Sequence, residues 1–425
     1  MSAKGTRTIE VDYLARVEGE GALYVRIRDD QLEDVKLRIF EPPRFFEAFL
    51  RGRRHDEAPD ITARICGICP IAYIMGASQA MEMACGVSPP GGAIRELRRM
   101  IYCGEWIESH VLHIYMLHAP DFLGYPDAMA MARDHRELVE SALRLKKIGN
   151  TIMQVIGGRE IHPVNTRLGG FYKAPSRDAI RALIPQLEWG LQFAQQTVAF
   201  VAGLPMPQFT FDYEFMALRN LHEYPIIEGR LASSRGVDLP VSEYDSWLQE
   251  EQVPHSTSLH TRTVAGGRVH TGPMARYALN RERLSPLASQ AALDAGLPDV
   301  VNNPFQSIVV RAVEVVFAFE ECLRIARAYQ PPEQSHVDVR PQAGTGYGAT
   351  EAPRGICYHR YTIDDDGIIQ DAKIVAPTSV NQAVIESDLA HFIPPRLISM
   401  RMSCATSVSR QSATTIRAYP ARVTF

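Results

Sequence analysis

Two cysteines three residues apart form the string with the clearest chemistry in the sequence. The segment from Arg64 to Pro70, RICGICP, puts the sulfurs of Cys66 and Cys69 on one side of a turn, and Gly67 permits a tight backbone there. This is chelate spacing for a thiophilic metal. Two buried free cysteines or a redox pair are the alternatives that the string alone leaves open.

The other cysteines do not form a second motif of this kind. The chain has seven cysteines, an odd number, and its N-terminal residues lack the apolar core of a signal peptide, so we expect metal binding or burial rather than a disulfide framework. No apolar run approaches the ~18 residues of a membrane span, and we expect a cytoplasmic protein without a transmembrane segment. The isolated cysteines are expected to be buried apolar residues: Cys85, Cys103, Cys322 and Cys357.

The composition is that of an ordinary globular protein. Hydrophobic residues make up 46% and charged residues 22% of the 425 residues, which excludes disordered, collagen-like and coiled-coil classes. Lys and Arg number 45 against 49 Asp and Glu, and this net charge of −4 gives no electrostatic footprint for nucleic acid. The glycine fingerprint G-x-G-x-x-G of dinucleotide-binding folds is absent, so any flavin or NAD(P) is expected on another subunit.

Apolar spacing predicts the strands and helices that must position these cysteines. Residues 22–28 and 35–40 alternate as two strands of a hairpin or small sheet, and residues 355–375 return to strand character. The remaining predictions are a mostly helical stretch at 45–149 that stops at Gly149, a helix at 177–203 restarted at Pro185, a helix at 308–328 and a short amphipathic helix at 381–389.

Together these elements predict an α+β fold. A mostly helical body of long packed helices carries a small strand-rich cap built from the N- and C-terminal segments. We expect one domain over residues 1–425, with the cap at 1–45, the helical body at 46–335 and a strand-containing C-terminal segment at 336–425.

Several further strings, in a fixed order, carry a resemblance that covers nearly the whole chain. The sequence resembles the large subunit of nickel–iron (NiFe) hydrogenases from about Arg16 to Thr406, and it looks most like the cytosolic, multi-subunit branch linked to NAD(P), sulfur or heterodisulfide partners. The matching strings besides residues 64–69 are RVEG at 16–19, FEPPRFFE at 40–47, GGREIHPVN at 157–165, GGFY at 169–172, APRG at 352–355 and APTSVNQ at 376–382.

The resemblance implies a metal centre held by two cysteine pairs. In the family these pairs bind nickel and an iron that carries carbonyl and cyanide ligands. Cys66 and Cys69 match the first pair, and Cys404 matches the second cysteine of the other pair. The position of that pair's terminal nickel ligand holds Arg401. Ser407 replaces the final histidine after which the family's chain is cut, so we expect the tail at 408–425 to be retained.

The resemblance also assigns roles to residues outside the cysteine pairs. Glu18 matches the carboxylate that shuttles protons beside the nickel. Glu41 matches a magnesium ligand, although Ser407 in place of the histidine opposite disfavours that ion. The residues that line the iron's diatomic ligands are matched by Arg354, Pro377 and Thr378.

Arg401 is the departure with the largest physical effect. A guanidinium in place of a thiolate changes the local charge by two units, because arginine stays protonated. Unit charges about 4 Å apart interact by on the order of 4 kcal/mol at an effective dielectric of about 20, so nickel there is repelled and also loses a soft donor. Arg401 could instead pair with the Cys66 thiolate. The iron half is less affected, because the bridging positions Cys69 and Cys404 remain.

We therefore expect a divergent hydrogenase-like large subunit in which ordinary hydrogen turnover is lost or reduced. It should pack against a small subunit with iron–sulfur clusters, inside a larger cytosolic electron-transfer complex. Three alternatives remain open. The chain could be an active hydrogenase with a three-cysteine nickel–iron site, a reductase that uses the Arg401 and Arg354 pocket for an anionic or quinone-like substrate, or a metal-free scaffold.

Overall fold

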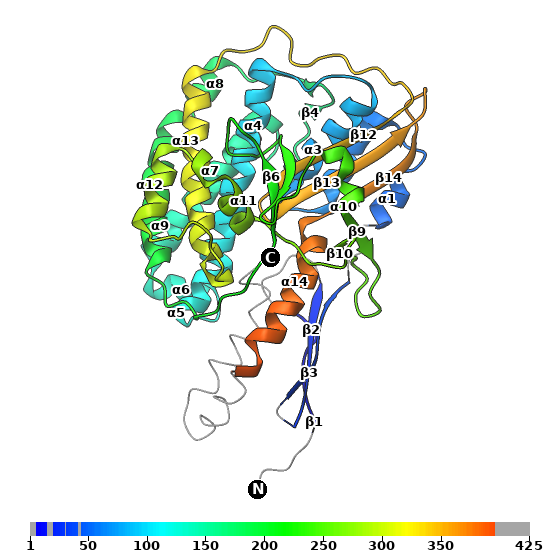
Figure 1. The fold of residues 1–425 in the computed structure, drawn as a ribbon. Helices are drawn as coiled ribbons and strands as arrows, with labels where there is room; N and C mark the ends of the chain where they lie inside the picture. Colours follow the sequence, from blue (N-terminus) through cyan, green and yellow to red (C-terminus); the bar gives the residue numbers. More distant parts are fainter. Residues whose placement is uncertain (1–5, 15–19, 30, 41–43, 396–425) are drawn as a thin grey trace.

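The computed structural model of the chain describes residues 6–14, 20–29, 31–40 and 44–395. Five of the residues singled out in the sequence, Glu18, Glu41, Arg401, Cys404 and Ser407, lie outside the described residues, as does the tail at 408–425. Within the described part the α+β class is confirmed: long helices gather on one side of the molecule, and short strands lie on the other side and at one end (Figure 1).

Long helices form the body around a shared apolar core. Helix α13 (Ser307–Ala328) is buried on nearly all its faces, because it lies between neighbouring helices and its apolar residues fill the space between them. The other long helices of the body are α3 (Pro70–Ala84), α4 (Gly92–Val111), α7 (Arg136–Gly157) and α9 (Ile184–Ala202). The shorter ones are α1 (Arg44–Leu50), α2 (Ala58–Thr62), α5 (Ala119–Leu123), α6 (Ala128–Asp134), α8 (Arg177–Arg181), α10 (Tyr244–Trp247), α11 (Pro273–Asn280) and α12 (Pro286–Asp294).

Gly149 does not end its helix, contrary to the sequence prediction. Helix α7 runs through it and ends before Gly158, whose φ of 81° is the left-handed conformation of a helix terminus. A Cβ atom on Gly149 would lie 2.6 Å from the carbonyl oxygen of Gly104 and 2.8 Å from the amide nitrogen of Glu108. The missing side chain therefore serves the close approach of α7 to α4. The predicted restart near Pro185 is confirmed, because α9 begins at Ile184.

Residues 6–39 and residues 344–375 contain two separate three-stranded antiparallel sheets. The first consists of β1 (Thr6–Val11), β2 (Gly21–Arg28) and β3 (Gln31–Ile39). The second consists of β12 (Gly344–Ala352), β13 (Gly355–Ile363) and β14 (Ile369–Val375). Strand β12 was not predicted, and it lies against α3, which follows the cysteine pair.

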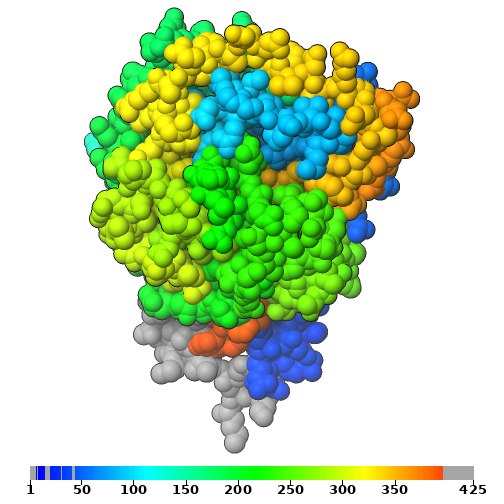
Figure 2. Space-filling model, turned by 45° about the horizontal axis from the view of Figure 1, so that its top comes forward, coloured from blue at the N-terminus to red at the C-terminus, as the bar shows by residue number. Residues whose placement is uncertain are grey.

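Helix α14 (Pro377–Phe392) joins the first sheet to the body. It is longer than the predicted segment 381–389, and it is buried on nearly all sides rather than amphipathic. Leu23, Leu37, Ile385 and Leu389 belong to the apolar cluster that β2, β3 and α14 share. In Figure 2 the end of α14 and the strands of the first sheet lie side by side below the body.

Short strands between residues 215 and 271 escaped the sequence prediction. They form one four-stranded sheet of order β11-β6-β7-β8 and a two-stranded pair of β9 and β10. Their bounds are β6 (Phe215–Arg219), β7 (Arg230–Ser233), β8 (Asp238–Leu239), β9 (Leu248–Glu251), β10 (His260–Thr263) and β11 (His270–Thr271); a further pair is β4 (Thr166–Arg167) with β5 (Gly170–Phe171).

Candidate active site

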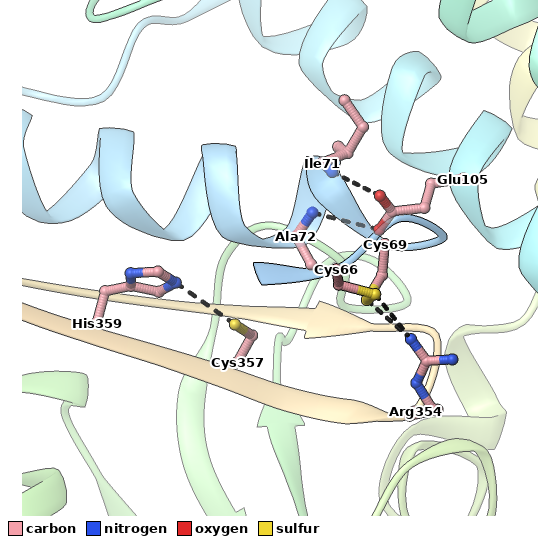
Figure 3. Close-up of a disulfide and its surroundings, with 8 residues drawn as sticks. All are labelled: Cys66, Cys69, Ile71, Ala72, Glu105, Arg354, Cys357 and His359. Carbon is pink, nitrogen blue, oxygen red and sulfur yellow. Dashed lines mark hydrogen bonds between the residues drawn. A yellow bond between two sulfur atoms is a disulfide. The ribbon is translucent and has the colours of Figure 1, made fainter. Parts of the chain in front are cut away.

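The cysteine pair lies at the entrance to α3. Cys66 has an extended backbone, and Cys69 is the residue that precedes the first turn of the helix, where Pro70 favours helix initiation. Both side chains are buried, and their Cα atoms are 5.5 Å apart. The two sulfurs form a disulfide in the structure (Figure 3). A disulfide is the oxidised form that a redox pair would take, and the same spacing lets the reduced sulfurs hold one metal ion.

Arg354 is the charged group that faces the pair. Its Nη2 donates to Cys69 Sγ at 2.8 Å and to Cys66 Sγ at 3.4 Å (Figure 3). The residue lies in the two-residue turn between β12 and β13, and Ala352 pairs with Gly355 across that turn. Gly355 has a φ of 137°, a conformation that favours glycine. The buried guanidinium stabilises thiolates over thiols, because a charge-assisted hydrogen bond is stronger to an anion.

Glu105 supports the first turn of α3 from the neighbouring helix α4. Its carboxylate accepts hydrogen bonds from the backbone amides of Ile71 at 2.5 Å and Ala72 at 3.2 Å (Figure 3). Such amides have no partner within their own helix, so the carboxylate fixes the helix end beside Cys69. Burial raises the pKa of Glu105 well above its usual range. No signal in the sequence marks this residue, because a lone glutamate on a helix indicates a solvated face.

A buried ionic network holds the turn that carries Arg354. Arg276 on α11 bonds Glu314 through two hydrogen bonds of 2.7 Å, and its Nη1 bonds Glu351 at 3.1 Å. Arg276 also donates to the backbone carbonyls of Ala352 at 2.8 Å and Pro353 at 3.1 Å, directly before Arg354. All three ionic side chains are fully buried. Sequence reasoning missed this network as well.

The contacts and burial of the network determine which of its side chains are charged. Arg276 holds the pKa of Glu314 at about 2 against the opposing effect of burial, and Tyr224 and His110 donate further hydrogen bonds to the same carboxylate. Burial raises the pKa of Glu351 to about 7, although Arg276 opposes the shift. Burial also lowers the pKa of His110 to about 4, so its ring is neutral at physiological pH.

The start of α14 is tied to the same turn through Thr271 on β11. Asn381 exchanges two hydrogen bonds with the Thr271 backbone, each 3.0 Å long, and the Thr271 hydroxyl accepts from the Ile356 amide at 3.0 Å. Pro377 and Thr378, which the sequence analysis placed at the metal site, are the first two residues of α14. Of the predicted site residues, the structure brings Cys66, Cys69 and Arg354 into direct contact. The four isolated cysteines are buried, as expected.

Glu250 on β9 is a partly buried acid beside this helix start, and its Oε1 accepts from the Ser379 hydroxyl at 3.2 Å. Burial raises its pKa from 4.5 to about 7, so between these values the folded chain keeps a proton that the unfolded chain has released. The free energy of unfolding should therefore fall as the pH rises through this window. In Glu250→Gln we expect this decrease in the free energy of unfolding to be smaller than in the wild type by on the order of 2 kcal/mol. The figure is reduced because the side chain is partly exposed to solvent.

The measurement is the urea midpoint at a series of pH values. Glu243→Gln, a change of an exposed glutamate nearby in the sequence, is the matched control and should keep the wild-type profile. Identical pH profiles for Glu250→Gln and the wild type would show that Glu250 is ionised in the folded chain throughout this range.

The known proteins to which the chain is similar are hydrogenases. The family described as nickel-dependent hydrogenase matches residues 44–141. The alpha chain of sulfhydrogenase 1 from Pyrococcus furiosus is 33% identical over 384 residues, 89% of each chain. The corresponding chain of the vhu F420-non-reducing hydrogenase from Methanococcus voltae is 29% identical over 407 residues, which cover 89% of this chain and 96% of that one.

Solved structures show the same fold. An NAD+-reducing nickel–iron hydrogenase in the H2-reduced state superimposes with a TM-score of 0.88 at 24% identity, over 99% of this chain and 98% of the other. The nickel–iron–selenium hydrogenase of D. vulgaris Hildenborough gives a TM-score of 0.73 at 23% identity, over 89% and 90%. Among the described residues, no helix is both long and apolar enough to span a membrane.

Proposed function

Because the chain belongs to the nickel-dependent hydrogenase family, we propose that it is a divergent large subunit whose ordinary hydrogen turnover is lost or much reduced. Membership in the family rests on sequence identity to the relatives along most of the chain. The family name implies that these relatives carry a metal centre. The divergence rests on one position of the sequence, Arg401, where the family carries a thiolate that binds nickel.

The replacement of a nickel-binding thiolate by Arg401 carries this proposal, and the contact of Arg354 with both sulfurs supports it. One buried guanidinium already faces Cys66 and Cys69. A second guanidinium from Arg401 would balance the second of these two thiolates, and only the charge of Cys404 would then be left to attract a cation. A nickel ion added to that pocket meets two guanidinium charges, each worth on the order of 4 kcal/mol of repulsion at about 4 Å.

The donors of this chain do not fit a four-thiolate nickel–iron centre. Cys66, Cys69 and Cys404 supply three sulfurs, and Arg401 has no lone pair to offer a metal. In the proposed arrangement Cys69 and Cys404 are the sulfurs left for an iron with carbonyl and cyanide ligands. Arg354, Pro377 and Thr378 would line those ligands, as their matches do in the family.

Other assignments complete the proposed site. Glu18 is proposed as the carboxylate that moves protons to and from the pocket, the role of its match in the family. Glu41 is proposed as the remnant of a magnesium site, which Ser407 leaves without its histidine. With that histidine gone, one protein ligand of the family's magnesium site is missing, so magnesium is disfavoured here.

We further propose the partners that a large subunit of this kind needs. The relatives are named as single subunits of larger hydrogenases. This chain would pack against a small subunit with iron–sulfur clusters and, through it, exchange electrons with subunits that carry a flavin or NAD(P). The whole assembly would be cytoplasmic.

The experiment is hydrogen uptake by the purified native complex with an artificial electron acceptor. We expect no uptake above that of the Cys66→Ala complex. Cys322→Ala, which removes a buried thiol of the helical core, is the matched control for loss of a cysteine and should behave as the wild type. Sustained uptake by the wild type that Cys66→Ala abolishes and Cys322→Ala retains would overturn the proposal.

A further inference from the structure

A second group of potential metal ligands lies outside the cysteine site. His255 is in the loop between β9 and β10, His260 is the first residue of β10, and Glu386 is on α14. Each offers one ligand atom, and these three atoms lie within 4.8 Å of one another. None of these residues belongs to the network around Arg354, and none was singled out in the sequence.

His260 is the member of this group that has no partner. Its side chain is fully buried, and neither ring nitrogen has a hydrogen-bond partner among the described residues. Burial lowers its pKa, so the ring is neutral and one nitrogen carries a free lone pair. A buried polar atom without a partner is costly, and such an atom in a native structure calls for an explanation. A bound cation at that nitrogen supplies one.

His255 and Glu386 are already oriented toward each other. The Nε2 of His255 lies 2.7 Å from Oε1 of Glu386, and the backbone amide of Leu37 on β3 donates to the same oxygen at 2.8 Å. Both hydrogen bonds fall on Oε1, so Oε2 remains as a metal ligand. The backbone amide fixes the carboxylate, as outer hydrogen bonds do at metal sites. Other charged groups facing the cluster are Arg262 and Glu251, which influence His260 through space.

We propose that His255, His260 and Glu386 bind a zinc ion. Two imidazole nitrogens and one carboxylate oxygen form a known three-ligand set for zinc, with the fourth position left to water. Imidazole suits zinc better than magnesium or calcium, which prefer oxygen ligands. Closure of the 4.8 Å span onto one ion requires small side-chain rotations, and the His255 hydrogen bond to Glu386 would be replaced by two bonds to zinc.

The ion would join three elements that the chain brings together from far apart. It would connect the β9–β10 loop and strand β10 to helix α14. The carboxylate of Glu386 on α14 in turn accepts a hydrogen bond from the Leu37 amide on β3. Glu386 follows Pro377 by nine residues, about 13 Å along the helix axis. The zinc would therefore fix the helix whose first turn lies at the proposed active site, and this role does not depend on hydrogen turnover.

The test uses the full chain, free of any histidine tag, with Cys66→Ser and Cys69→Ser as background so that the cysteine pair cannot bind zinc. After chelation, the protein is dialysed against Zn²⁺ and the bound zinc is measured. We expect one zinc per chain. This zinc should be lost in His260→Ala and in Glu386→Gln, and it should remain in His222→Ala, which changes an exposed histidine.

X-ray absorption at the zinc edge supplies a second measurement that needs no further variant. The background protein should show two imidazoles and a carboxylate around the ion. Absence of bound zinc in the background protein, undiminished zinc in folded His260→Ala, or a coordination shell without imidazole would each overturn the proposal. If His260→Ala fails to fold, the zinc content of Glu386→Gln and the absorption spectrum show whether these residues bind the ion.

Discussion

Replacement of Arg354 by methionine is expected to slow alkylation of the reduced Cys66 and Cys69 at neutral pH by about tenfold to a hundredfold. Arg354 donates to both sulfurs from a buried position, at 2.8 and 3.4 Å. A hydrogen bond to a charged group contributes roughly 1.5–3 kcal/mol, and each 1.4 kcal/mol corresponds to a factor of about ten. Without the guanidinium the thiolate form loses this stabilisation, and the thiolate is the form that reacts.

The measurement is the rate of iodoacetamide modification at each cysteine, followed by mass spectrometry. Arg360→Met is the matched control, because Arg360 lies on β13, the strand that follows the turn with Arg354, but bonds Asp371 and Asp245 instead of sulfur. Its alkylation rates should equal those of the wild type. Equal rates in Arg354→Met and the wild type would mean that the contact in the structure does not govern the chemistry of the pair.

Loss of Arg276 is expected to destabilise the protein by about 3–5 kcal/mol, because Arg276→Met leaves two buried carboxylates without their cation. Glu314 and Glu351 are both fully buried, and the first is bonded by Arg276 at two atoms. The change should appear as a lower urea midpoint. Because Arg276 also holds the carbonyls before Arg354, alkylation of Cys66 and Cys69 should slow in this variant too.

Two comparisons separate the buried charge from simple loss of packing. Arg281→Met removes an arginine from an exposed pair with Asp299, and it should cost less than about 1 kcal/mol. The double variant Arg276→Met with Glu314→Gln should recover part of the lost stability, since the stranded carboxylate is gone. A double variant no more stable than Arg276→Met would show that packing, rather than charge, accounts for the loss.

The elements that the sequence predicted are those whose signals are local. Alternation of apolar residues predicts the hairpin of β2 and β3. An apolar run predicts helix α13, and Pro185 predicts the start of α9. Most of the missed strands have two to five residues, too few to show alternation. Strand β11 also depends on a distant partner, because it pairs with β6 through His270 and Phe215. Gly149 was misread for the same reason, because its role is contact with α4 and not termination of α7.

The residues of the candidate site likewise divide into those with a local sequence signal and those without one. Cys66, Cys69 and Arg354 lie in recognisable strings, and the structure places them together. Glu105 and Arg276 carry no string of their own. On a helix, an isolated charged residue indicates a solvated face, and only the packing of α4 and α11 against their neighbours buries these two. Their partners come from other segments, so no spacing along the chain reveals them.

If Arg401 excludes nickel from this large subunit, as we propose, nickel content is the quantity that shows it most directly. Nickel per large subunit should be measured in the purified native complex by elemental mass spectrometry, since iron–sulfur partners would mask an iron assay. We predict that the wild type contains no nickel above background and that Arg401→Cys, which restores the missing thiolate, gains it. One nickel per wild-type chain would contradict the account and would favour a working three-cysteine hydrogenase site.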